Sequence, residues 1–397
     1  KFRFASNGKD RMTTTTTDFD RLTEQLQQTG VDGMLESLAE QLVAERRFHE
    51  LFEVRKMQVR RRIGLSALYS DAGDDLEPSR RDQLEAGLLE ACREVGLGLL
   101  AAGRIREGWM YFRPIGDKKP VREALARIEV DDENLDEIVE VALHEGVDVA
   151  RGYGLVLEHY GTCNAITTYE SVVPHHPRAD QQAAGALLVK HLHHELSASV
   201  MADIGRQEGQ TPAAASLETL VSDRDWLFTE HSYHVDTTHL ASTVRIARLL
   251  DDPEPLRLAL DLTHYGRHLS KQFQYQGDEP FADIYPSHAM YFQALLGENV
   301  DQAVDYFRQK AEQVDQQEFG TIAIEVYVDL LHRIGRSADA VQAFMTMIPS
   351  DARVRGIAPS LFELCKAAGS YDQLRDFCRQ REDLLGFATA LVCREEG

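Results

Sequence analysis

The stretches GRIREGWMYF (residues 103–112) and GRSADAVQAF (residues 335–344) share one pattern. In both, a small residue stands five positions after the first glycine, and a phenylalanine stands nine positions after that glycine. A leucine stands four positions before the same glycine. A glycine permits a tight turn between two helices. The small residue lets the two helices approach closely, and the aromatic ring fills the groove beside it. The pattern therefore predicts a helical hairpin around Gly103 and another around Gly335.

The same turn recurs along the chain. It is repeated in GSYDQL (369–374) and RRFHEL (46–51), and with the glycine displaced by one position in GENVDQAVDYF (297–307) and GTCNAITTY (161–169). The later hairpins recur about every 34 residues. The earlier ones, aligned on Leu51, Gly108 and Ala165, recur every 57 residues. We therefore expect a series of hairpins in which the earlier members are longer.

These hairpins resemble the tetratricopeptide-like helix-turn-helix repeat over about half of the chain. The resemblance implies an α-α superhelix of stacked hairpins with a concave inner surface that binds a peptide or a protein. The 57-residue spacing also suits an (α/α) toroid, so the middle of the chain is a place where the superhelix could close.

Amphipathic helical periodicity extends over the rest of the chain. Leu188, Leu192, Leu196 and Val200 recur at helical spacing, and sustained strand alternation is hard to find. We therefore expect an all-α protein. The expected parts are a disordered leader at 1–18, of which residues before Met12 look foreign, N-terminal hairpins at 19–130, a histidine-rich centre at 131–290 and tetratricopeptide-like repeats at 291–397.

Composition restricts the partners. The formal net charge is −22, which disfavours nucleic acid and anionic membranes. No apolar run approaches the length of a membrane span. The five cysteines are scattered and form neither a disulfide framework nor a metal motif, which indicates a reducing, cytoplasmic compartment. Phosphate-binding and dinucleotide-binding loops are absent from the sequence, so no nucleotide cofactor is expected.

Histidines are concentrated in the middle of the chain. Thirteen of the fifteen lie between His144 and His288. His264 and His268 form an HxxxH pair, a spacing that can place two imidazoles on one metal ion. Imidazole and carboxylate ligands suit Zn, Mn, Fe or Ni. The predicted metal ligands are His191, His194, His231, His234, His239, His264 and His268.

Two carboxylates stand beside these histidines. Glu195 shares a helix face with His191 and His194, and Asp236 is placed as an N-cap between His234 and His239. Both are candidate acid/base groups beside a metal-bound water. Exposed histidines on a helix flank are also common in proteins without any such site.

Two functions follow from these features. The first is a binding protein that presents a histidine-rich concave surface to a protein, a peptide or a small molecule. The alternative is a metal-dependent enzyme in which the central hairpins surround a divalent transition metal that activates water. The oligomeric state, the partner and the substrate are not specified by the sequence.

Overall fold

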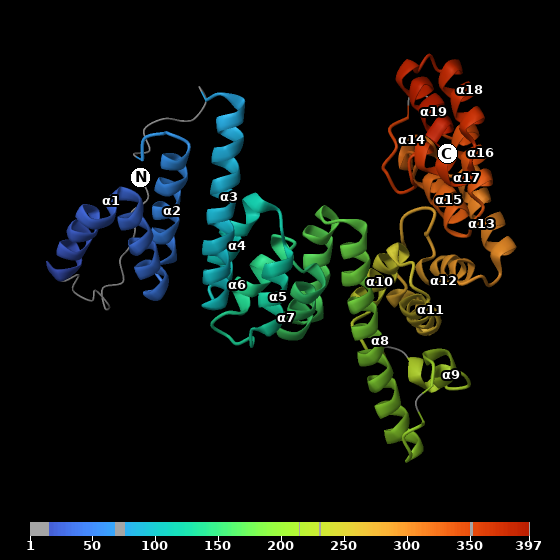
Figure 1. Cartoon of the computed structure of the whole chain (residues 1–397). Coiled ribbons are helices and arrows are strands. Elements are labelled where there is room, and N and C mark those ends of the chain that lie inside the picture. The colour runs from blue at the N-terminus through green and yellow to red at the C-terminus, as the bar shows by residue number, and fades with distance from the viewer. Residues whose placement is uncertain (1–15, 68–75, 214, 230–231, 350–351, 397) are drawn as a thin grey trace. The chain divides into compact units, whose positions relative to one another are not determined.

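The computed structural model describes residues 16–67, 76–213, 215–229, 232–349 and 352–396. Within these ranges the chain consists of helices and connecting turns, without a β-strand (Figure 1). A single isolated bridge joins Gln276 and Asp283 there. The prediction of an all-α fold of packed helical hairpins is confirmed. Residues 1–15 of the predicted leader, which was expected at 1–18, lie outside the described residues.

Two compact units divide the chain, residues 1–152 and 153–397. The chain passes from one to the other near the start of α7 (Val149–Ser171). The first unit contains α1 (Thr16–Ala44), α2 (Phe48–Arg62), α3 (Pro78–Ala101), α4 (Ile105–Phe112), η1 (Arg113–Ile115), α5 (Lys119–Arg127), α6 (Leu135–Val139) and η2 (Glu140–His144).

The second unit holds most of α7 and all of the later helices. Its first half comprises η3 (Val173–His175), α8 (Arg178–Glu208), α9 (Leu217–Val221), η4 (Asp225–Phe228), α10 (Thr237–Ile246), η5 (Ala247–Leu249), α11 (Pro253–His268) and η6 (Lys271–Phe273). Its second half comprises α12 (Ile284–Leu295), α13 (Val300–Gln313), α14 (Gln316–Phe319), α15 (Ile322–Arg333), α16 (Ser337–Met347), α17 (Leu361–Ala368), α18 (Tyr371–Gln380) and α19 (Leu384–Glu396).

The predicted turns end helices in a shared way. At Gly103, φ is +77°, and the next N–H, that of Arg104, donates to the carbonyl oxygen of Leu99 at 3.0 Å. At Gly335, φ is +80°, and the N–H of Arg336 donates to the carbonyl oxygen of Leu331 at 2.8 Å. This bond closes the helix end when the turn residue is left-handed, a conformation that glycine adopts at little cost. The same bond follows the turn residues Arg46, Gly297 and Gly369.

The predicted turn at Gly161 has a different geometry. Gly161 lies inside α7 with φ +80° and ψ 171°, so α7 consists of two helical segments joined at a sharp break. The glycine therefore separates two helical segments as predicted, without a connecting loop.

Small residues allow α3 and α4 to approach closely in the first unit. A Cβ atom on Gly96 would lie 2.7 Å from the Phe112 ring, and one on Gly108 would lie 2.6 Å from the side chain of Leu100. The ring of Phe112 is fully buried over this contact. The expected roles of the small residue and the aromatic residue in this hairpin are therefore observed.

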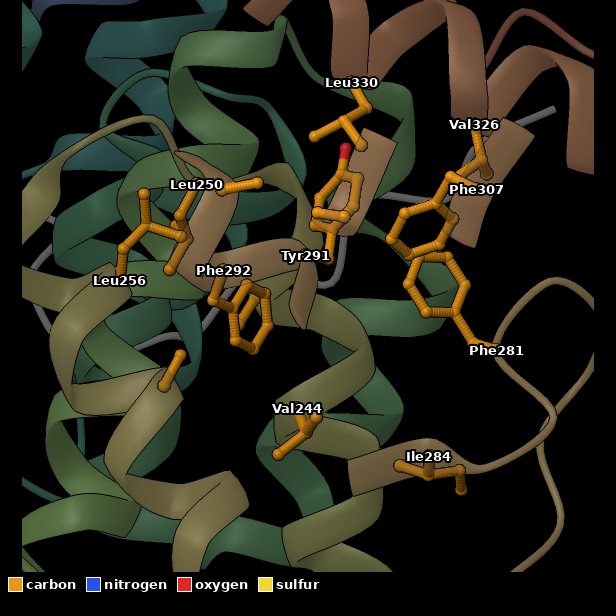
Figure 2. Packing of buried hydrophobic residues seen from close by; sticks show 14 of the residues in the cluster. Val244, Leu250, Leu256, Phe281, Ile284, Tyr291, Phe292, Phe307, Val326 and Leu330 are labelled. Carbon is orange, nitrogen blue, oxygen red and sulfur yellow. The ribbon is translucent and has the colours of Figure 1, made fainter. Parts of the chain in front are cut away.

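The core of the second unit is continuous along its helices. From α11 onward, helices pack mainly against their neighbours in sequence, and α8 and α10 lie against α11 (Figure 1). Figure 2 shows Phe281, Tyr291 and Phe307 together, with Val326 and Leu330 of α15 nearby. No helix in the described ranges combines the length and the apolar character that a bilayer crossing requires.

Candidate functional site

Four histidines of the central region, His193, His234, His264 and His268, lie where a segment without long helices packs on α8 and α11. This covering segment, residues 209–236 without the undescribed positions 214 and 230–231, links the end of α8 to the start of α10. It contains α9 and η4. Its apolar residues enter the main core of the second unit, namely Leu217, Leu220, Val221, Leu227 and Val235.

The first polar contact under this segment is a buried histidine–aspartate pair. Nε2 of His193 on α8 donates to Oδ2 of Asp261 on α11 at 2.7 Å. The same carboxylate accepts the backbone N–H groups of Leu217 at 2.7 Å and Glu218 at 3.0 Å. Asp261 thus joins both long helices to the start of α9.

The charge of Asp261 is stabilised by its donors. Burial alone raises the pKa of this carboxyl, but the hydrogen bonds from His193, Glu218 and Leu217 outweigh burial and lower the pKa overall. A buried carboxylate that accepts three hydrogen bonds is therefore ionised at neutral pH.

A second histidine links the end of the covering segment to the same two helices. Nε2 of His234 lies 3.2 Å from Oδ2 of Asp203 on α8, and Nδ1 lies 2.9 Å from the hydroxyl of Tyr265 on α11. That hydroxyl also accepts the backbone N–H of His234 at 3.0 Å. For a neutral imidazole, this pattern selects the tautomer with the proton on Nε2, because a carboxylate can only accept.

Neighbouring groups adjust the acidity of this second contact. A hydrogen bond from Arg206 and then one from His234 lower the pKa of Asp203, against the opposing effect of burial. Burial raises the pKa of Tyr265 to about 12. Tyr265 is therefore neutral at physiological pH and can donate to Nδ1 of His234.

The HxxxH pair of α11 lies at the edge of the covering segment. Nδ1 of His264 is 3.7 Å from Oε1 of Glu218, and Nδ1 of His268 donates to the carbonyl oxygen of His264 at 2.8 Å. The ring of His268 stacks on Phe228 of η4 with 5.3 Å between centroids. Phe228 in turn contacts Tyr265.

The predicted site residues fall into two sets. His234, His264 and His268 belong to the contacts just described. His191 bonds to Thr162 at 3.1 Å and lies 3.9 Å from Glu195. The other predicted residues were His194 and Glu195, which are exposed on α8, His239, which is half-buried in the first turn of α10, and His231, which lies outside the described residues.

Asp236 has a local role. Its carboxylate accepts the N–H of Thr238 at 2.8 Å and the Thr238 hydroxyl at 2.6 Å, so it caps α10 as the sequence predicts. Hydrogen bonds from Thr238 lower the pKa of Asp236.

The structure also tests whether these residues form a metal-holding group. Among the described residues, no three histidine, cysteine, aspartate or glutamate side chains gather closely enough to hold a metal ion. The imidazoles of His193, His234, His264 and His268 instead contact single carboxylates, a hydroxyl or a backbone carbonyl. Metal ligation by the predicted set stays a prediction, because one of its members, His231, is not described.

Sequence reasoning missed the two aspartate contacts that join the helices. His193 was not among the predicted site residues, yet it makes the shortest histidine–carboxylate contact described on α8. Asp203 carried no signal, because its partner is 31 positions away in the chain. Tyr265 was not among the predicted site residues either, and the structure shows that its hydroxyl contacts His234.

Comparisons with known proteins add no assignment to this geometry. No family model, no curated protein and no solved structure matches the chain. The interpretation of the site therefore rests on its own contacts.

Proposed function

We propose that this chain is a tetratricopeptide-like repeat protein that binds a protein or peptide partner on the histidine-rich surface formed by α8, α11 and the covering segment. The proposal rests mainly on one feature, a set of exposed aromatic and imidazole side chains held by a buried, well-bonded support.

The repeat character supports a binding role. The five predicted turns at Arg46, Gly103, Gly297, Gly335 and Gly369 share the same left-handed conformation and the same closing hydrogen bond. From α11 onward, the helices other than the short α14 pack mainly against their neighbours along the chain. Stacked hairpins of this kind offer extended surfaces, which repeat proteins use for recognition.

The exposed side chains supply the chemistry of recognition. Tyr233 is 53% exposed and meets the ring of Phe273 edge-on at 5.3 Å. The exposed His268 stacks on Phe228, which is partly buried. Large aromatic side chains held in place are the residues that contribute most to protein interfaces.

The support beneath this surface favours binding without large rearrangement. His234, adjacent to Tyr233, is bonded at both ring nitrogens, and Phe228 contacts the buried ring of Tyr265. Side chains fixed in this way lose little conformational entropy when a partner binds.

A peptide library displayed on phage tests the proposal with the full chain. Peptides selected on the wild type should lose at least about tenfold in affinity with Tyr233→Ala or His268→Ala, since truncation of a central contact costs on the order of 1–2 kcal/mol. His159→Ala is the matched control, because His159 is exposed on α7 outside this surface. Selected peptides that bind all variants equally, or a library that yields no binder, would contradict the proposal.

A metal-dependent enzyme is the second candidate, and the HxxxH pair favours it. His264 and His268 stand one helical turn apart, with Glu218 beside the first of them. The enzyme proposal predicts that untagged protein retains near-stoichiometric Zn, Mn, Fe or Ni and loses it with His264→Ala or His268→Ala. Substoichiometric metal that both variants leave unchanged would remove the basis for this candidate.

A further inference from the structure

A pocket of about 690 Å³ lies in the second unit, away from the histidines. Its described walls come from the first residue of α14, the two residues between α14 and α15, and residues 352–355, which precede α17. The lining includes Gln316, Gly320, Thr321, Arg353 and Arg355. Its volume falls in the range of pockets that hold small molecules.

The charge of this pocket is opposite to that of the chain. Two arginines line it, the guanidinium of Arg355 lies beside Gly320, and none of its described lining residues carries a carboxylate. Within the described residues, neither Arg353 nor Arg355 has an ion pair or a side-chain hydrogen bond as donor. The chain as a whole carries a formal net charge of −22. At physiological salt the screening length is about 8 Å, so the local charge governs what enters.

Other described pockets differ in this respect. A pocket of about 550 Å³ includes Arg127, but Glu123 lies 3.8 Å from that guanidinium. A smaller pocket includes Arg55, whose guanidinium is bonded to Glu36 and Glu94. In these two pockets a carboxylate of the chain already pairs with an arginine.

A buried glutamate holds the backbone of the segment that carries Arg353 and Arg355. Glu325 of α15 is 1% exposed, and its carboxylate accepts the backbone N–H groups of Arg355 at 2.8 Å and Ile357 at 2.9 Å. It also accepts the hydroxyl of Thr321 at 2.6 Å. These donors compensate the charge of Glu325 without using a guanidinium group. The arginine side chains are therefore left for another anion.

The opposite wall is shaped by a glycine. Gly320 has φ +66° and ψ −143°, a region that essentially only glycine occupies. The guanidinium of Arg355 lies over it, 4.0 Å from the place where a Cβ atom would stand. The Arg355 guanidinium therefore lies close to Gly320, and a side chain at position 320 would contact it.

We infer that this pocket binds a small anion bearing carboxylate or phosphate groups. The planar guanidinium group matches both kinds of oxyanion with paired hydrogen bonds. Gln316 and Thr321 line the same pocket and are neutral polar residues.

Calorimetric titration of the full chain tests the inference with three probes: inorganic phosphate, pyrophosphate and citrate. At least one should bind saturably with a Kd below about 1 mM. The double variant Arg353→Ala/Arg355→Ala should weaken that binding by at least about tenfold, and Arg353→Lys/Arg355→Lys should restore only part of it because lysine lacks the planar fork. Tighter binding of citrate than of pyrophosphate would assign carboxylate chemistry, and the reverse order would assign phosphate chemistry.

Arg257→Ala is the matched control, because this arginine is exposed on α11 and faces Glu298 across 3.4 Å. It should bind the same probe as the wild type does, and circular dichroism should show equal helix content in all variants. Wild-type protein that binds none of the three probes would overturn the inference. So would a double alanine variant that binds as tightly as the wild type, or an equal loss of binding in Arg257→Ala.

Discussion

Removal of the Asp261 carboxylate should release the covering segment from α8 and α11. This carboxylate accepts three hydrogen bonds, from His193 and from the backbone N–H groups of Leu217 and Glu218. Its side chain is only 11% exposed. Asp261→Ala leaves all three donors without their acceptor at the place where the covering segment begins to pack.

The expected loss of stability follows from the number of donors that lose their acceptor. A buried donor that loses its acceptor costs about 1–3 kcal/mol. Two of the three donors are backbone amides at the start of the short helix α9, where water can reach them once the segment loosens, so the lower value applies. The expected loss is then about 3 kcal/mol for Asp261→Ala. Asp261→Asn keeps an acceptor for Glu218 and loses the oxygen shared by His193 and Leu217, so it should cost about 2 kcal/mol.

Hydrogen exchange measured by mass spectrometry reports this local free energy without requiring the whole chain to unfold. Peptides from residues 215–229 should exchange on the order of a hundredfold faster in Asp261→Ala than in the wild type. Asp252→Asn is matched in charge to Asp261→Asn. Its side chain caps α11, and asparagine caps as well as aspartate, so exchange should change little. Exchange of residues 215–229 in Asp261→Ala within about threefold of the wild type would refute the reasoning, since that ratio equals only about 0.6 kcal/mol.

Two further predictions follow from acidity and from packing. The pKa values of Asp261 and Asp203 are lowered in the folded chain, so their contribution is present above the unfolded carboxyl pKa of about 3.9 and is lost as pH falls through the lowered folded values. The protection factors of residues 215–229, which compare the measured exchange with the intrinsic exchange rate at each pH, should thus fall steeply only below about pH 4. A fall in protection between pH 7 and 5 that Asp261→Asn leaves unchanged would show that other groups hold the covering segment. Gly96→Ala should destabilise the first unit by about 1–3 kcal/mol in urea unfolding because its Cβ would meet the Phe112 ring at 2.7 Å. Gly154→Ala, whose Cβ would only touch Leu187 at 4.0 Å, should be neutral or stabilising, and an equal loss in both variants would point to a general intolerance of alanine.

The fold could be predicted from the sequence because its signals are local. A leucine, a glycine, a small residue and an aromatic within fourteen positions specify a hairpin, and Gly103 and Gly335 both adopt the expected left-handed turn. The break at Gly161 was also visible as a glycine signal. What the pattern does not contain is the separation of the chain into two units near Gly152, which depends on contacts between distant residues.

The site could be predicted only in part because its contacts join distant positions. The concentration of histidines drew attention to the region of α8 and α11 where the histidine–aspartate contacts lie, and Asp236 is the cap that its spacing predicted. His193 and Asp261 are 68 positions apart, so their pairing depends on which face of α8 packs against α11. A helical period places a residue on a face, but it does not say which neighbouring helix will cover that face.

The shared helix end has a consequence for how such a chain changes length over evolutionary time. Each closing bond, such as that from Arg336 to Leu331, is made inside its own hairpin and involves no residue of another hairpin. Duplication or loss of one whole hairpin therefore conserves every turn, and only the two newly adjoining helices must fit each other. Shortened or lengthened relatives should accordingly differ by entire hairpins, with their joints falling outside the glycine turns.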